Sequence, residues 1–168
     1  LHGGGFKAWT FDPVAINGGL LMPTVGVQYL TGLWTPVDID VTKIHYSVQT
    51  AGASLTAGQN HVSLYGADRN RIATVNQDTA FASTGFKTAA IGSTVTIPAG
   101  RFWIAFLSNG TTKPVLNRSV GQGLAVLNGL HGANAARFGS SGSAQTTPPA
   151  GPISIAALTT TSYWGAVS

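Results

Sequence analysis

Residues 59–112 constrain the fold of this chain more than any other stretch, because short apolar runs there alternate with residues that form tight turns. Val62, Leu64 and Ile72 mark two short extended runs. The segment 66–70 between them supplies the Gly, Asp and Asn that tight turns need for positive φ angles and for side-chain bonds to the backbone. The pattern predicts a β-hairpin with a polar, charged tip.

The segment 101–107 is apolar on both faces of the strand that it predicts, and it follows a turn at 98–100. Successive side chains of a strand point to opposite faces. One face carries Phe102, Ile104 and Phe106, and the other carries Trp103, Ala105 and Leu107. A strand of this kind is expected to be buried on both sides. Residues 59–112 therefore specify an antiparallel, all-β core.

The rest of the chain extends this pattern into a single domain over residues 6–168. Polar and apolar residues alternate over 43–48, which is typical of a half-buried strand. Seven to ten short strands at this turn spacing predict an antiparallel, jelly-roll-like β-sandwich. Residues 1–5 are expected to be a linker from an upstream element. Residues 121–139 are expected to form a loop with one helical turn, since their glycines disfavour a longer helix.

The composition limits the kinds of partner that the chain can have. Charged residues make up only 8% of its 168 residues, against roughly 25% in ordinary soluble domains. The net charge of +4 comes from nine Lys and Arg residues that are scattered singly. Nucleic-acid-binding proteins gather such residues on one face, so we expect no nucleic-acid partner. No apolar run approaches the roughly 18 residues of a membrane span, so we expect no membrane insertion.

No spacing of acidic, nucleophilic or metal-ligating residues indicates an enzyme. Asp38 and Asp40 share one face of a predicted strand, whereas a glycosidase needs two carboxyl groups about 5–9.5 Å apart across a cleft. We expect this pair to face solvent. His45 and His61 have no metal-site spacing and are expected to be solvated or hydrogen-bonded. The chain is therefore predicted to be non-enzymatic, with no cofactor and no bound metal.

Trp34 and Tyr65 are the aromatic residues expected to be exposed, whereas Trp103 is expected to be buried. An exposed aromatic ring offers a flat apolar face on which a sugar ring can stack. The hairpin tip and the loop at 77–78 add hydrogen-bond donors and acceptors of the kind that sugar hydroxyls use. The candidate ligand-binding residues are Trp34, Tyr65, Asp68, Arg69, Asn70, Gln77 and Asp78. The alternatives are core packing for the aromatic residues and ordinary turn chemistry for the polar ones, and general residue preferences favour these alternatives.

Several phrases, spread over nearly the whole chain, carry a resemblance to a known family. They are LYGADRNRIATVNQDTAF (64–81), GFKTAAI (85–91), VTIPAGRFWIAFLSNGTT (95–112), SYWGAV (162–167), GGFKAWTFDPVAINGG (4–19) and TAGASLTAGQNHVSLY (50–65). These phrases resemble the C-terminal β-sandwich domain of minor tail proteins from phages of actinobacteria. None of them is a catalytic motif.

The resemblance implies a structural or adhesion module of a virion tail, located outside the cell on the virion. The partners that it implies are other tail subunits and a glycan of the host cell surface. It also implies a homotrimer, because tail fibres and tips are commonly three-fold. The low charge and the second apolar face of 101–107 agree, since loops of the same chain or a neighbouring copy must cover that face.

Two other classes of protein stay open. One is a carbohydrate-binding module of a secreted protein, which exposed and coplanar Trp side chains on one sheet would favour. The other is a capsid decoration or assembly module, in which an apolar subunit interface would dominate the surface.

Overall fold

A computed structural model describes residues 5–119, 136–157 and 162–168 of the chain. The expected linker at 1–5 lies outside this part except for Gly5, and so does most of the expected loop at 121–139. Both expectations therefore stay predictions.

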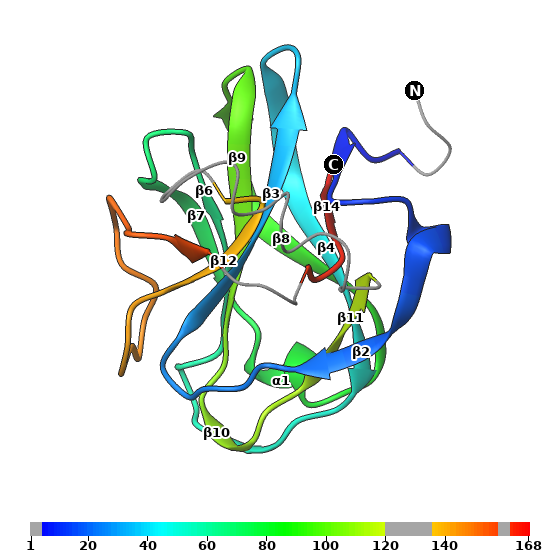
Figure 1. The fold of residues 1–168 in the computed structure, drawn as a ribbon, viewed down its shortest axis with the longest axis vertical. Coiled ribbons are helices and arrows are strands. Elements are labelled where there is room, and N and C mark those ends of the chain that lie inside the picture. Colours follow the sequence, from blue (N-terminus) through cyan, green and yellow to red (C-terminus); the bar gives the residue numbers. More distant parts are fainter. Residues whose placement is uncertain (1–4, 120–135, 158–161) are drawn as a thin grey trace.

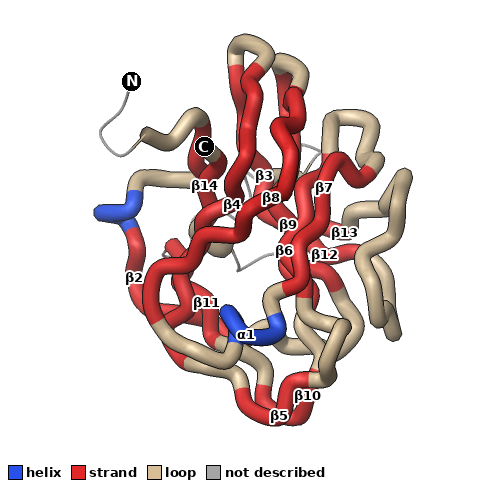
Figure 2. The backbone as a smooth tube through the Cα atoms, turned by 180° about the vertical axis from the view of Figure 1, so that it is seen from behind, coloured by secondary structure: helices blue, strands red, loops and turns tan. Residues whose placement is uncertain are grey.

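The first sheet is built around the long strand β4 (Ile39–Thr50), which has neighbours along both edges. One edge pairs with β8 (Gly85–Ile97), and Figure 2 shows this pair across the back of the molecule. The other edge pairs first with β14 (Gly165–Val167) and then with β11 (Val115–Ser119). The remaining strands of this sheet are β1 (Ala8–Trp9), which pairs with β14, and β2 (Ile16–Leu21), which pairs with β11.

The second sheet has six strands in the order β13-β12-β3-β9-β6-β7 and lies in front of the first sheet in the view of Figure 1. Its strands are β13 (Ala156–Ala157), β12 (Phe138–Ser141), β3 (Gln28–Thr35), β9 (Gly100–Leu107), β6 (His61–Tyr65) and β7 (Arg71–Asn76). All pairings in both sheets are antiparallel. The predicted all-β, antiparallel sandwich is confirmed, while the jelly-roll form stays a prediction.

Short elements close the lower end of the sandwich as Figure 1 shows it. A two-stranded ladder joins β5 (Ala53–Leu55) to β10 (Gly110–Thr112), and the short helix α1 (Asp78–Phe81) lies nearby. A 3₁₀ helix at Pro13–Ala15 links β1 to β2, and the Asp12 carboxylate caps it by accepting from the Val14 N–H at 2.9 Å. The hairpin turns between β3 and β4 and between β8 and β9 lie at the opposite, upper end (Figure 1).

The core lies between the inner faces of the two sheets. Phe102, Ile104 and Phe106 of β9 are fully buried there, as their alternation predicts. The ring of Phe106 stands edge-on to Tyr46 of β4, with centroids 5.7 Å apart, and to Tyr163, with centroids 5.8 Å apart. Edge-to-face pairs of this kind add to the stabilisation from burial alone.

The outer face of β9 is also buried, because the segment 136–157 of the same chain covers it. Trp103 is 2% exposed and packs with Tyr65, Ile153 and Ile155 in a second apolar cluster. Its indole Nε1–H donates to the carbonyl oxygen of Ala136 at 3.1 Å. Loops of the same chain therefore cover the face that had suggested a neighbouring copy. The homotrimer stays a prediction, but this face no longer argues for it.

We expect Trp103→Ala to lower the free energy of unfolding by about 3–5 kcal/mol, because it leaves a cavity and an unpaired carbonyl under 136–157. Trp34→Ala is the matched control: Trp34 is 65% exposed, and exposed substitutions usually change stability by less than about 0.5 kcal/mol. Urea unfolding followed by circular dichroism measures both. Equal losses in the two variants would contradict the packing described for β9.

Candidate functional site

The predicted polar hairpin joins β6 to β7, and internal hydrogen bonds fix its turn. Arg69 N–H donates to the carbonyl oxygen of Gly66 at 2.8 Å, and Arg69 has a positive φ of 66°. The Asp68 carboxylate accepts from the backbone N–H of Asn70 at 3.0 Å and from its side-chain amide at 2.8 Å. These bonds, led by the one from the Asn70 side chain, hold the pKa of Asp68 below its usual value.

A hollow of about 460 Å³ lies where this turn meets the hairpin of β8 and β9. We call it the tip hollow. Its polar lining comes from Asp68, Asn70, Arg71, Thr96 and Arg101, and apolar side chains, including those of Ile72, Ile97 and Pro98, line much of the rest. Its volume lies within the roughly 300–1,000 Å³ range of pockets that bind small ligands. Apolar surface combined with a few convergent polar groups is also characteristic of such pockets.

Arg69 does not line the tip hollow, although the sequence placed it beside Asp68 and Asn70 as a candidate. Its guanidinium Nη1 donates to the carbonyl oxygen of Ile153 at 3.1 Å. Arg69 therefore ties the hairpin to the segment that covers the second sheet, which is a structural role.

Tyr65 is fully buried, so the expectation that it is exposed is wrong. Its hydroxyl donates to the carbonyl oxygen of Pro149 at 2.9 Å and accepts from the Gln28 amide at 3.1 Å. Burial raises the pKa of this hydroxyl. The sequence pattern predicted that the outer side of β6 faces solvent, but the segment 136–157 covers it. Because of this long-range contact, Tyr65 cannot belong to a surface site.

Gln77 and Asp78 lie at the other end of β7 from the tip. Gln77 is buried and accepts a hydrogen bond from the Tyr46 hydroxyl at 2.5 Å. Asp78 accepts from the Gly58 N–H at 2.7 Å and from the Asn60 amide at 2.8 Å. Although partial burial acts in the opposite direction, these bonds hold the pKa of Asp78 below its usual value.

The six residues of β7 place Gln77 and Asp78 roughly 20 Å from the tip. Of the predicted polar candidates, the structure therefore brings only Asp68 and Asn70 to the tip hollow. Gln77 and Asp78 organise the start of α1 and the loop before β6 instead.

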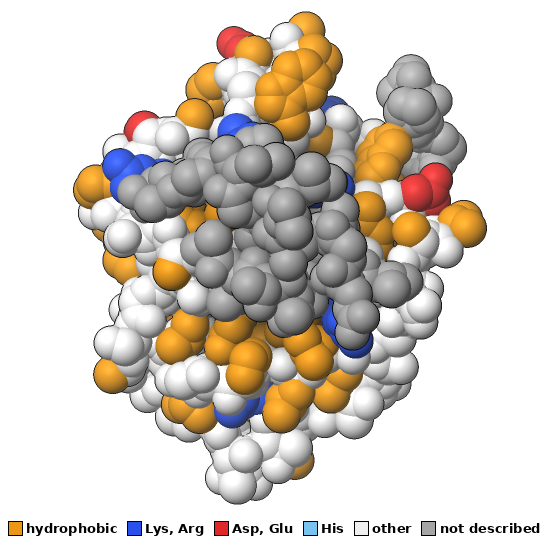
Figure 3. Space-filling model, viewed as in Figure 1, with side chains coloured by type: hydrophobic (Ala, Val, Ile, Leu, Met, Phe, Trp, Pro, Cys, Tyr) orange, Lys and Arg blue, Asp and Glu red, His pale blue; other side chains and the backbone are white. Residues whose placement is uncertain are grey.

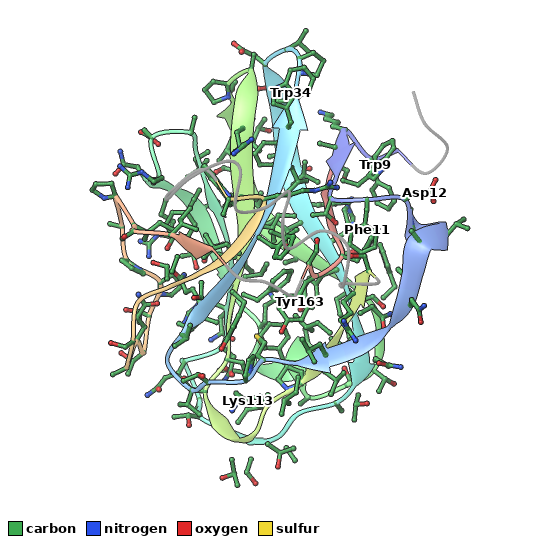
Figure 4. All side chains as sticks on the ribbon, in the orientation of Figure 1. Trp9, Phe11, Asp12, Trp34, Lys113 and Tyr163 are labelled. Atoms are coloured by element: carbon green, nitrogen blue, oxygen red, sulfur yellow. The ribbon has the colours of Figure 1, made fainter. Side chains whose placement is uncertain are left out.

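Trp34 is exposed, as expected, and it lines a second hollow of about 260 Å³. We call this one the tryptophan hollow; its walls include Trp9, Trp34, Arg101 and Arg137. Figure 4 shows Trp34 near the turn between β3 and β4 and Trp9 on the N-terminal strand. Figure 3 shows hydrophobic side chains gathered over the same upper turn, where Val37 is also exposed.

Arg101 connects the two hollows, because it is a lining residue of both. It is the register partner of Trp34 across β3 and β9, which places the two side chains next to each other on one face of the sheet. Neither Arg101 nor Arg137 was a candidate from sequence. Only the register of β3 with β9 identifies Arg101, and Arg137 lies far away in the chain.

The two acids that follow Trp34 in the chain are exposed, as expected, and they support the upper hairpins. Asp38 accepts from the Ala99 N–H at 2.8 Å, and Asp40 accepts from the Thr96 hydroxyl at 2.6 Å. Both carboxylates thus tie β4 to the hairpin of β8 and β9. They do not face each other across a cleft.

The histidines of the described segments take part in local hydrogen bonds. The ring nitrogens of His45 lie 3.0 Å from the Thr88 hydroxyl and 2.8 Å from the Ser168 hydroxyl. Burial, together with the nearby charge of Lys43, lowers the pKa of His45.

Within residues 5–119, 136–157 and 162–168, no three His, Cys, Asp or Glu side chains form a group that could hold a metal ion. In the same part of the chain, no helix has the length and apolar character needed to span a bilayer.

Neither a scan against models of known protein families nor a search of curated proteins found a match to this chain. The tail-protein resemblance therefore rests on the quoted phrases alone.

We expect Asn70→Ala to raise the pKa of Asp68, because the lost amide is the strongest contact that favours the charged carboxylate. The pKa should stay below its usual value, since the backbone N–H of residue 70 still donates to the carboxylate. Carbon-detected NMR titration of the Asp68 carboxyl group measures the change. Asn117→Ala removes a distant bond to Ser47 and should leave this pKa unchanged. A lower pKa in the Asn70 variant would contradict the described turn.

Proposed function

We propose that this chain is a non-enzymatic adhesion domain of a phage tail, which binds a glycan of the host cell surface at the tip hollow. The observation that carries the proposal is the lining of this hollow. The Asp68 carboxylate accepts hydrogen bonds, the guanidinium groups of Arg71 and Arg101 donate them, and the Asn70 amide and the Thr96 hydroxyl can do both. A sugar ring presents the complementary set, with hydroxyls that donate and accept around an apolar ring face.

The rigid surroundings of the tip hollow favour binding, because a preformed site loses less conformational entropy when the ligand binds. Arg71 N–H donates to the Ala150 carbonyl at 2.7 Å, and its guanidinium donates to the Pro148 carbonyl. Gly151 approaches the turn closely, since a Cβ there would lie 2.4 Å from Asn70 Oδ1. The segment 148–153 thus holds Asn70 and Arg71, two walls of the hollow, in place.

The phage-tail setting is supported by the phrases at 64–81, 95–112 and 162–167, which resemble the tail-protein domain. The jelly-roll form is supported by the order in which the strands pair. The first sheet contains the path β2-β11-β4-β8, and the second contains β3-β9-β6-β7. Strands in such an order cross repeatedly between the two sheets, as in the eight-stranded jelly rolls of viral proteins.

The tryptophans give little support to the alternative of a carbohydrate-binding module with a flat aromatic platform. Trp103 and Trp164 are 2% and 3% exposed, and Trp9 is half-buried. Trp34 alone among them is largely exposed. A platform of coplanar exposed Trp rings is therefore missing from the described surface.

We expect Asn70→Ala to weaken binding of the fluorescently labelled domain to actinobacterial cell walls at least fivefold, while its melting temperature falls no more than that of the control variant. Asn76→Ala is the matched control, because Asn76 also donates to an aspartate carboxylate, that of Asp78, at the far end of β7. Pull-down with purified walls measures binding. Equal binding by wild type and both variants would remove the tip hollow from the proposal.

The proposal includes a homotrimer, which the low charge supports. Apolar side chains such as Val14, 92% exposed, and Val37, 59% exposed, stand on a surface with few charges to keep copies apart. Light scattering should then give three times the chain mass of 17.2 kDa. A mass of 17.2 kDa at high micromolar concentration would remove self-association of this domain from the proposal.

A further inference from the structure

We propose that the tryptophan hollow is a second subsite that binds an anionic group, a carboxylate or a phosphate carried by a sugar unit. The inference rests on the proposed function, since Arg101 lines both hollows and would let one glycan chain extend from the first to the second. The volume of about 260 Å³ lies just below the roughly 300–1,000 Å³ range of ligand pockets, which suits one ring-sized unit.

Several distant segments converge to build this hollow. The N-terminal strand supplies Trp9 and Thr10, the end of β3 supplies Trp34, β9 supplies Arg101, and the approach to β12 supplies Arg137. Thr10 is fixed to β14, because its N–H donates to the Gly165 carbonyl at 2.9 Å and its hydroxyl accepts from the Gly165 N–H at 3.1 Å. A position assembled from so many held segments is preorganised for a ligand.

Arg137 is positioned over β3 by a close backbone approach at Gly32, where a side chain would be tight. The Gly32 N–H donates to the Arg137 carbonyl at 2.5 Å. A Cβ at position 32 would lie 3.0 Å from that carbonyl oxygen and 3.3 Å from Trp103 Nε1. The guanidinium then turns toward the N-terminal strand, where Nη2 donates to the Thr10 carbonyl at 2.9 Å. A guanidinium carries five N–H donors, so this bond leaves others that can face a ligand.

The charge in the tryptophan hollow has one sign. Arg101 and Arg137 line it, and none of its lining residues in the described chain is acidic. The tip hollow differs, because Asp68 offsets part of its positive charge. Guanidinium groups match the planar geometry of carboxylates and phosphates, and they bind both through charge-assisted hydrogen bonds. The exposed indole of Trp34 supplies an apolar face beside these donors for the sugar ring.

A nucleic acid is the other polyanion that such a hollow could attract, but the arrangement favours a glycan. Nucleic-acid binders place basic residues along a stripe that follows successive phosphates. Here the hollow offers two arginines, and the remaining described basic residues lie scattered over other elements. A single anionic group on a sugar fits this local concentration of charge better than a charged backbone does.

The test compares three probes that share one ring: glucose, glucuronate and glucose 6-phosphate. Each is titrated into the ¹⁵N-labelled domain while the indole N–H signals are followed by NMR. We expect the anions to shift the Trp34 and Trp9 signals with a dissociation constant at least fivefold lower than that of glucose. The preference should shrink as salt is added. The signals of the buried Trp103 and Trp164 should shift less, because neither residue lines the hollow.

Arg137→Gln should reduce the anion preference at least threefold, whereas Lys43→Gln removes the same charge from an exposed position on β4 and should not. Arg137→Gln also removes the bond to Thr10, so Trp34→Ala serves as a second variant. It should weaken the binding of all three probes. Preference for glucuronate alone or for the phosphate alone would support the subsite and identify its anion.

Three results would overturn the inference: equal dissociation constants for glucose and both anions, an equal loss of preference in Lys43→Gln, or tighter binding of oligothymidylate that Arg137→Gln abolishes. The two proposals fail separately. If cell-wall binding depends on Asn70 but the domain shows no preference for anions, only the proposed anionic subsite is contradicted. If an anion preference depends on Arg137 but cell-wall binding is insensitive to Asn70, only the proposed glycan site at the tip hollow is contradicted.

Discussion

The pairing of β3 with β9 is the interaction on which the rest of the molecule depends. It runs without a break from Tyr29 opposite Phe106 to Thr35 opposite Gly100. Because β9 is apolar on both faces, this pair creates two buried surfaces, one against the first sheet and one under the segment 136–157. At the upper end, where burial stops, the same register places Trp34 beside Arg101. The tryptophan hollow thus lies at the solvent-exposed end of the central strand pair.

The local parts of this architecture could be predicted from sequence. The alternation in 101–107 predicted a strand buried on both sides, and the Gly, Asp and Asn of 66–70 predicted the polar hairpin, because turn chemistry and a period of two are local properties. Trp34 was correctly expected to be exposed, since it precedes a Thr-Pro turn. Asp68 and Asn70 were correctly placed at a tip, and the structure adds the hollow beside them.

The failures share a physical cause, which is contact between segments far apart in the chain. Tyr65 has the local pattern of a surface residue, but its hydroxyl donates to the Pro149 carbonyl and the segment 136–157 buries it. Gln77 sits in a polar loop, yet its side chain turns inward to the hydroxyl of Tyr46. Arg137 joins the site through a backbone hydrogen bond to Gly32 of β3, where there is little room for a side chain. The periodicity of apolar residues within one strand does not predict contacts of this kind.

The pairing of β1 with β14 has a mechanical consequence. The N-terminal strand is held by two residue pairs, Ala8 with Val167 and Trp9 with Ala166, and by bonds from the N–H groups of Lys7 and Thr10. Tension on the chain before Phe6 would load these few bonds first, ahead of the long β4-β8 ladder. Trp9 and Thr10 are also walls of the tryptophan hollow. Tension on the N-terminal strand would therefore act directly on two walls of that hollow.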